Sequence, residues 1–435
     1  MKTAILAIVF GALLACFYPT LNSSFRELLT SLINSAFTNS PIKASATATT
    51  TTSNTSSFLK KPALAVPTLE PTTFTETIMI PRTIAKVFKA VEKAEGAGAR
   101  VRRSVGTPHL KNLSPFLMLD HFSVSVGAGF PDHPHRYDTT PLPLLHNDPI
   151  YPTMLEVVLT VVFLGNSGQE TITYLLHGSI DHEDFAGNKG TINKGDLQFM
   201  TAGRGIMHAE MPGKSVDGTP NVGLQLWVDL PKHLKYCEPR YRDLAAEEIP
   251  SIETDGDKVH VKIISGTSHG VDSVRDLAYT PVWILDVTMK AGARVEQPLP
   301  SGWNALVYML KGKAAFGKET EKEVDEFHTV VFDKAGDGIV VSTDENAKED
   351  ANFGKLFFTF HMIGREFLLL TDVFWGVLLV IIAGEPLDQT VVQYGPFVLN
   401  TDEEVYQAMM DFQGHSNGFE RAKGWKSEIG KPMRG

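Results

Sequence analysis

Two stretches of the sequence share one pattern, and this repetition decides the fold. The first reads TYLLHGS (residues 173–179) followed by INKGDLQFMTAG (192–203), and the second reads VYMLKGK (307–313) followed by FHTVVFDKAGDG (327–338). Each stretch contains a strand-like run, a tight glycine turn, a second strand-like run and a Gly-Asp pair. Two copies of such a unit predict two related β-barrels.

The chain from residue 79 onward is dominated by similar short runs. They are roughly four to eight residues long, rich in β-branched and aromatic side chains, and closed by Gly, Asp or Asn. Short strands at regular spacing are typical of all-β sandwiches and barrels. The expected fold class is therefore all-β, with two tandem antiparallel β-barrels.

One helix is expected near the C-terminus. Asn400 and Thr401 can cap its start, and residues 402–404 are acidic, which suits the positive end of a helix dipole. An apolar stripe at helical spacing follows, formed by Val405, Ala408, Met409 and Phe412.

Composition excludes several classes of protein. The 435 residues are 43% hydrophobic and carry a net charge of -10, so no overall basic field favours sequence-specific nucleic-acid binding. The local basic run at 86–103 is interpreted as a solvated face of an element. The two cysteines, Cys16 and Cys237, exclude a disulfide framework and a CxxC zinc site, which fits a reducing compartment.

The first 78 residues are interpreted as a targeting or disordered extension. Residues 4–17 form an apolar stretch that suits a signal sequence better than a membrane span. Residues 22–69 are rich in Ser and Thr and contain one acidic residue, Glu27, which also suits an organelle transit sequence. Plastid or other organelle import and secretory entry both stay open.

Two pairs of side chains have the spacing of metal ligands. His133 and His135 are two residues apart, as are His208 and Glu210, and residues i and i+2 of a strand point to the same face. Three imidazoles and one carboxylate suit iron, manganese, nickel, copper or zinc. A carboxylate with open coordination positions favours non-haem iron. The second repeat offers only His328 at the corresponding place.

Eight motifs, in order along the chain, resemble those of the pirin family of the cupin superfamily. They are LKNLSPFLMLDHF, GFPDHPHR, TYLLHGSIDHEDFAG, GDLQFMTAGRGIMHAEMP, GLQLWVDLP, IAGEPL, YGPFVLNTDEEV and NGFERAKGWKSEIG. The resemblance implies two cupin barrels packed face to face, over residues 79–255 and 256–435. It also implies Fe2+ on His133, His135, His208 and Glu210 in the first barrel, and no metal in the second.

The resemblance leaves two classes of function open. Family members are described as nuclear or cytoplasmic transcriptional co-regulators, and some open the flavonol quercetin with dioxygen. The resemblance therefore implies a metal-binding, iron-dependent transcriptional co-regulator, with quercetin 2,3-dioxygenase activity as a further function. The alternatives are a purely non-enzymatic protein-binding module and a damaged or alternative splice product with an impaired metal site. A monomer and a transcription-related protein partner are expected. Beside the ligands, His182 is expected near the pocket and Glu170 is expected to orient an imidazole.

Two segments depart from the family pattern. Residues 137–167 follow the HPHR motif, and residues 359–379 interrupt what should be one strand. We interpret both inserts as translated intron sequence or a gene-model error, with a genuine splice form as the alternative. An insert this close to His135 is expected to impair the metal site, because metal ligands must keep their distances within a few tenths of an ångström.

Overall fold

The computed structural model describes residues 79–95, 98–125, 127–128, 130–133, 167–214, 218–274, 277–318, 321–345, 357–362, 365–370 and 376–431. For 130–133, 357–362 and 365–370 it describes the backbone. The predictions about the N-terminal extension, about His135 and about most of the first insert lie outside these residues.

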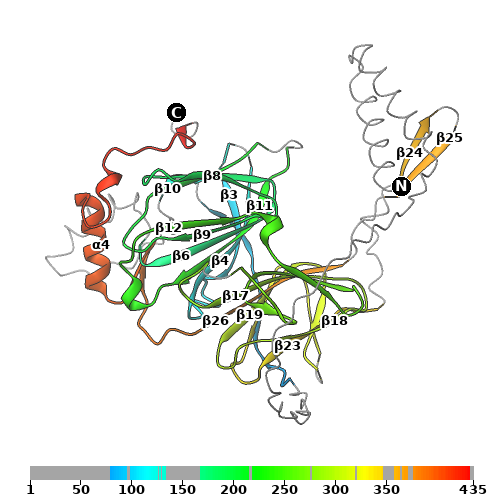
Figure 1. Cartoon of the computed structure of the whole chain (residues 1–435). Coiled ribbons are helices and arrows are strands. Elements are labelled where there is room, and N and C mark those ends of the chain that lie inside the picture. The colour runs from blue at the N-terminus through cyan, green and yellow to red at the C-terminus, as the bar shows by residue number, and fades with distance from the viewer. Residues whose placement is uncertain are drawn as a thin grey trace, which may run out of the picture. The chain divides into compact units, whose positions relative to one another are not determined.

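The N-terminal barrel consists of two antiparallel sheets (Figure 1). Its seven-stranded sheet has the order β12-β9-β6-β11-β4-β3-β2, and its four-stranded sheet has the order β5-β10-β7-β8. The strands are β2 (Glu92–Glu95), β3 (Ala99–Val105), β4 (Phe116–Val124), β5 (Phe130–His133), β6 (Gln169–His177), β7 (Ser179–Asp184), β8 (Lys189–Asn193), β9 (Leu197–Thr201), β10 (His208–Pro212), β11 (Asn221–Asp229) and β12 (Arg240–Leu244).

The C-terminal barrel has the same construction, as the sequence repeat predicts. Its sheets have the orders β1-β22-β19-β26-β17-β14-β13 and β18-β23-β20-β21. The strands are β1 (Ile84–Lys89), β13 (Ser251–Thr254), β14 (Val259–Ser265), β17 (Val282–Met289), β18 (Arg294–Pro298), β19 (Asn304–Lys311), β20 (Ala314–Phe316), β21 (Lys322–Val324), β22 (His328–Phe332), β23 (Gly338–Ser342) and β26 (Val377–Gly384).

Short elements complete the described part of the chain. Three pairs of strands form small sheets of their own: β15 (Thr267–Ser268) with β16 (Val271–Asp272), β24 (Phe357–Met362) with β25 (Arg365–Leu370), and β27 (Val392–Tyr394) with β28 (Phe397–Leu399). The helices are η1 (Lys232–Leu234), η2 (Ala246–Glu248), α4 (Asp402–Gly414) and η3 (Glu420–Ala422). No helix among the described residues is both long and apolar enough to cross a membrane.

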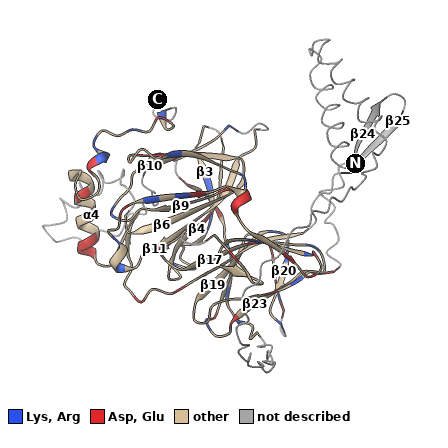
Figure 2. Ribbon diagram, in the orientation of Figure 1, with Lys and Arg blue, Asp and Glu red and all other residues tan. Residues whose placement is uncertain are grey.

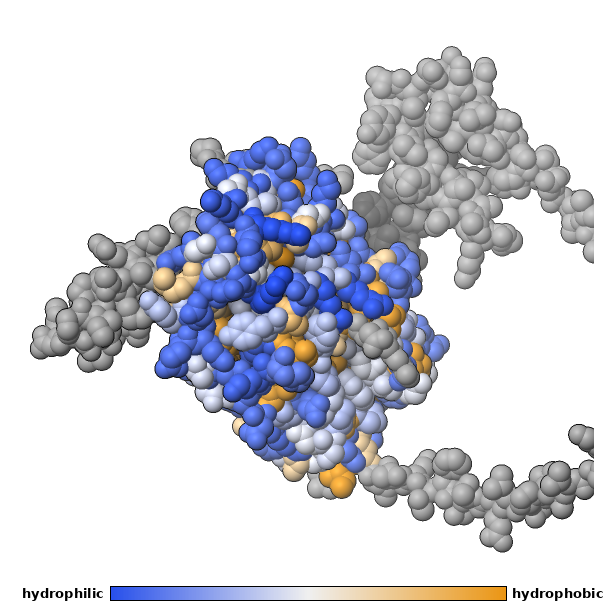
Figure 3. Space-filling view, turned by 60° about the vertical axis from the view of Figure 1, so that its left-hand side comes forward, coloured by the Kyte–Doolittle hydropathy of each residue, from blue (hydrophilic) through white to orange (hydrophobic). Residues whose placement is uncertain are grey.

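The two seven-stranded sheets pack against each other. Leu224 and Leu226 of β11 share one buried cluster with Leu306 of β19 and Ile382 of β26. Polar contacts cross the same interface, since the Tyr174 hydroxyl donates to Asp286 Oδ2 at 2.6 Å. The outer surface is mainly hydrophilic on the face in Figure 3, with apolar residues in small patches.

The chain crosses between the barrels at both ends. β1 precedes the first barrel in sequence but pairs with β22 of the second. In the other direction α4 and β28 pack on the first barrel, where Phe397 and Met409 share a buried cluster with Met200 of β9 (Figure 1). The predicted domains, 79–255 and 256–435, are continuous segments of the chain. In the structure, β1 from the first segment belongs to the second barrel, and β28 and α4 from the second segment pack on the first barrel.

The predicted C-terminal helix is confirmed as α4. Thr401 is its N-cap, its hydroxyl accepts from the backbone N–H of Glu404, and the Glu404 carboxylate accepts from the backbone of Thr401. Acidic residues occupy the first turn (Figure 2), where they interact favourably with the helix dipole.

Both predicted inserts include residues of the barrels. Leu379, predicted as the end of the second insert, lies in β26, pairs with Val287 and Met309, and is fully buried. The second insert therefore ends before Val377. Ser167, predicted as the end of the first insert, is also buried and donates its hydroxyl hydrogen bond to the Gly203 carbonyl.

Candidate metal centre

The second predicted ligand pair lies on one buried strand. His208 and Glu210 belong to β10, with exposed fractions of 1% and 5%. β10 lies between β5 and β7, so His208 is opposite His133 on one side and Asp184 on the other. Glu210 is opposite His182 of β7, which places His182 beside the pair as expected.

The first ligand pair is described only in part. The backbone of His133 ends β5 and pairs with His208, whereas His135 lies outside the described residues. Among the side chains that the structure describes, no group of three or more His, Cys, Asp or Glu could hold a metal ion. His208 and Glu210 are two of the four predicted ligands.

His208 has the protonation state that a metal ligand needs. Burial, followed by the charge of the nearby His182, lowers the pKa of its imidazole to about 3. The ring is therefore neutral at physiological pH. A neutral imidazole can offer a nitrogen lone pair to a divalent cation.

Gln225 of β11 holds the Glu210 carboxylate in position. Its Nε2 donates to Glu210 Oε2 at 3.1 Å, and its Oε1 accepts from Trp227 Nε1 at 3.1 Å. Since the indole N–H can only donate, it determines which end of the amide faces Glu210. Gln225 is not among the residues predicted from the sequence, although a glutamine between two leucines of a buried strand is a signal for such a residue.

Gln225 belongs to a row of polar residues that crosses six strands of the seven-stranded sheet. Each member is directly paired with the next, and five of the six are buried. In strand order, this polar row consists of Arg103, Asp120, Gln225, Thr173, Gln198 and Asp243. Directly paired residues share a face, and the contact between Gln225 and Glu210 shows that this face is the barrel interior.

The corresponding row of the C-terminal barrel is entirely aliphatic. It crosses six strands in the same way and belongs to the core of that barrel. Its members are Val87, Val330, Val307, Ile381, Leu285 and Ile263. Burying polar groups costs free energy unless each finds a partner, whereas aliphatic groups gain from burial. The N-terminal interior is thus less favourable for stability and suited to a polar ligand.

A second pair of polar groups joins the two sheets of the N-terminal barrel, with His182 on β7 and Asp243 on β12. His182 Nε2 is 3.2 Å from Asp243 Oδ2, and the His182 ring stacks on Tyr241 with centroids 5.9 Å apart. Asp243 keeps 43% of its side chain exposed, so the pair connects the barrel interior to solvent.

Two interpretations of single residues are wrong. Glu170 does not orient an imidazole: its carboxylate accepts from the Thr201 hydroxyl and from the backbone N–H groups of Tyr279 and Thr280. The basic run at 86–103 is not simply a solvated face, because Arg103 is 5% exposed and forms two hydrogen bonds to Asp120.

The donor set fits a divalent metal ion. A neutral imidazole and a carboxylate suit first-row divalent metals, and both groups are buried beside polar side chains. The fixed orientation of Glu210 by Gln225 is the kind of outer contact that metal-ligating carboxylates have.

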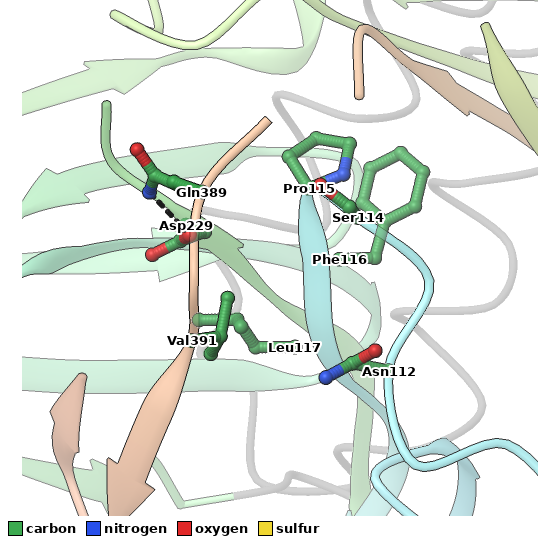
Figure 4. Close-up of a pocket in the computed structure, with 8 residues that line it drawn as sticks. All are labelled: Asn112, Ser114, Pro115, Phe116, Leu117, Asp229, Gln389 and Val391. Carbon is green, nitrogen blue, oxygen red and sulfur yellow. Dashed lines mark hydrogen bonds between the residues drawn. The ribbon is translucent and has the colours of Figure 1, made fainter. Parts of the chain in front are cut away.

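A separate small pocket lies at the end of the N-terminal barrel (Figure 4). Its volume is about 160 Å³, and it is lined by Asn112, Ser114, Pro115, Phe116, Leu117, Asp229, Gln389 and Val391. Gln389 Nε2 donates to Asp229 Oδ2 at 2.7 Å across it. Ligand pockets typically hold about 300–1,000 Å³, so this pocket is too small for a ligand of ordinary size.

Comparisons with known proteins agree on one family. The family models "Pirin" and "Pirin C-terminal cupin domain" match residues 157–228 and residues 284–351 and 365–418. Pirin of Homo sapiens is 41% identical over 341 residues, which are 78% of this chain and 95% of the relative. Pirin-like protein of Solanum lycopersicum is 41% identical over 348 residues, 80% of this chain and 97% of the relative.

Solved structures share the fold. A quercetin 2,3-dioxygenase from Acinetobacter baumannii has a TM-score of 0.57 at 23% identity, over 77% of this chain and 98% of that chain. GK1651 from Geobacillus kaustophilus has a TM-score of 0.52 at 24% identity, over 72% of this chain and 100% of that chain.

Proposed function

This chain belongs to the pirin family, and from that membership we propose that its N-terminal barrel is a metal-dependent dioxygenase site for a flavonol such as quercetin. The proposed ligands are His133, His135, His208 and Glu210, and the proposed metal is Fe2+. The observation that carries the proposal is the polar row, which lines the barrel interior beside His208 and Glu210.

Several contacts support the ligand set. His208 and Glu210 are buried on one strand, and His133 is paired with His208 on the next. His135 rests on the resemblance of the HPHR motif alone. A bound Fe2+ would supply redox chemistry toward dioxygen, which the side chains of this chain do not provide themselves.

The residues of the chain have three tasks in this proposal. Gln225 orients Glu210, and the buried interior keeps bulk water from the ligand. The third task is removal of the proton from an acidic substrate hydroxyl. His182 lies opposite Glu210 and is paired with Asp243, whose carboxylate reaches solvent, so we assign this task to these two groups.

Oxygen uptake tests the proposed reaction. The iron-loaded chain is expected to consume dioxygen and to bleach the visible absorption of quercetin, and Glu210→Gln should be at least about tenfold slower because it removes a charged ligand. An oxygen electrode and absorption spectra measure both. His328→Ala in the second barrel is the control and should match the unchanged chain. Because the first insert is expected to impair the site, the same assay is repeated on a chain without residues 137–166. Absence of turnover by both iron-loaded proteins would contradict the proposal.

Gln225→Met is expected to weaken metal binding by roughly tenfold, because Glu210 loses the contact that orients it and other outer partners of metal ligands have effects of this size. Competition with a fluorescent chelator measures the affinity. Equal affinity of the variant and the unchanged chain would remove Gln225 from the site.

The other implications of the resemblance stay predictions. They are a transcription-related protein partner, a monomeric state, and a location in nucleus or cytoplasm. A chain that binds iron without turning over quercetin would favour the co-regulator function over the enzyme.

A further inference from the structure

We propose that the C-terminal segment 418–431 is a clasp that positions β10, the strand of the proposed ligands His208 and Glu210, from outside the barrel. The identity of the ligands rests on the proposed function, whereas the contacts of the clasp do not. The clasp adds positioning residues to the site from a segment that is far from it in sequence.

The clasp packs on the residues that lead into β10. After α4 the chain runs back along the β10 side of the N-terminal barrel (Figure 1). Phe419 and Ala422 are buried in one cluster with Ile206 and with Phe185, which directly follows β7. Ile206 lies two residues before His208, so the buried part of the clasp lies next to the start of the ligand strand.

The fit between the clasp and the loop before β10 is close. Gly205 has a φ of 145°, and a Cβ atom there would lie 2.3 Å from Cζ of Phe419. On the other side of the contact, a Cβ atom at Gly418 would lie 3.0 Å from the carbonyl oxygen of Arg204. The ring of Phe419 therefore packs directly on the backbone, and a gap of about 0.5–1 Å would already lose much of this contact energy.

A second contact reaches β10 through β7. The Glu183 carboxylate accepts from the backbone N–H groups of Glu428 and Ile429 at 2.9 Å and 3.3 Å. Glu183 is directly paired with Ala209, the residue between the two ligands on β10. Hydrogen bonds to an ionised carboxylate are stronger than bonds between neutral groups, so this contact holds the clasp against the middle of the ligand strand.

Two further contacts fix the shape and place of the clasp. Ser427 is 0% exposed, and its hydroxyl oxygen accepts from the backbone N–H of Gly430 at 3.0 Å, which holds the turn that presents two N–H groups to Glu183. Arg421 Nη1 donates to the Ala186 carbonyl at 3.1 Å, between β7 and β8. The clasp is thus attached at several separate points around β7 and β10.

The clasp and the proposed ligands lie on opposite faces of β10. Glu210 contacts Gln225 in the barrel interior, and successive residues of a strand alternate between faces, so Ala209 points outward. Ala209 is nevertheless 0% exposed, so this outer face is covered. Because metal ligands must keep their distances within roughly 0.2 Å, a ligand strand that loses its outer support is expected to bind metal more weakly.

Hydrogen exchange of the metal-free chain tests whether the clasp orders β10. Phe419→Leu and Glu183→Ala should each speed exchange of the amides in residues 204–212 by roughly tenfold, because local opening of this region no longer has to break the full set of contacts. Glu183→Gln is the conservative control and should exchange like the unchanged chain, since its amide oxygen can still accept from both N–H groups. Unchanged exchange in both Phe419→Leu and Glu183→Ala would overturn the inference.

Metal affinity separates positioning from general stability. Phe419→Leu and Glu183→Ala should bind Fe2+ roughly tenfold more weakly, as measured by anaerobic competition with a fluorescent chelator. The matched variant is Val405→Ala, which removes a buried side chain from the same cluster about two turns before Phe412, the α4 residue whose ring packs on Phe419. Val405→Ala should lower the melting temperature and leave both the exchange of residues 204–212 and the Fe2+ affinity unchanged.

Three results of the affinity measurement are decisive. An affinity loss in Val405→Ala as large as that in Phe419→Leu would show that only overall stability matters, and the clasp would have no positioning role. Unchanged Fe2+ affinity in both Phe419→Leu and Glu183→Ala would also overturn the inference. If the unchanged chain binds no Fe2+, the proposed ligand set fails, and hydrogen exchange still decides whether the clasp orders β10.

Discussion

Replacement of His208 by alanine is expected to reduce bound iron from about one ion per chain to almost none. Loss of an outer partner of a metal ligand already costs roughly 10–100-fold in affinity, and His208→Ala removes one of only four proposed protein ligands. The neutral, buried imidazole has no neighbour that could replace it on β10, where Ala209 separates it from Glu210. Metal analysis after gel filtration measures the content.

The control for His208 lies in the second barrel. His328 begins β22, and its Nδ1 lies 3.2 Å and 3.1 Å from the carbonyl oxygens of Asp325 and Glu326. His328→Ala should therefore keep the full iron content. Because alanine at the buried position 208 also leaves a cavity, circular dichroism of the metal-free variant must show that it is folded. A folded His208→Ala chain with one iron would show that the ligand assignment is wrong.

Lys235→Met is expected to lower the free energy of unfolding by about 3–5 kcal/mol, because it leaves the buried Asp229 carboxylate without its cation. Lys235 and Asp229 are each 1% exposed and form an ion pair. The Lys235 ammonium also donates to the Gly168 and Val398 carbonyls at 2.8 Å and 2.9 Å. One cation thus joins β11, the start of β6 and the C-terminal strand β28. Urea unfolding measures the change.

Two further variants separate the charge from the packing. Adding Asp229→Asn to Lys235→Met removes the uncompensated carboxylate and should restore part of the lost stability. Lys232→Met, an exposed lysine in the preceding turn, should change stability by less than about 0.5 kcal/mol. Equal stability of Lys235→Met and Lys232→Met would show that the buried pair contributes nothing.

Much of the fold could be predicted because it depends on local pattern. Alternating apolar and polar residues between glycine turns predict the short strands. The α4 cap involves only Asn400, Thr401 and Glu404, which are neighbours in sequence. The end of the second insert could not be predicted. By sequence alone, the apolar residues 377–379 resemble part of an insert that would be exposed and prone to aggregation. In the structure they lie in β26, and β17 and β19 pair with this strand on its two sides.

The sequence by itself determined the strand pattern, the repeat, the helix and the two i, i+2 pairs that mark His133, His135, His208 and Glu210. Only the tertiary structure decided that Arg103, Asp120, Gln225, Thr173, Gln198 and Asp243 form one row, and that Glu170 serves the interface instead of the site. Periodicity assigns a residue to one of two faces of its strand, whereas its neighbours depend on strand order and register. These are set by hydrogen bonds between segments far apart in the chain, so no local pattern contains them.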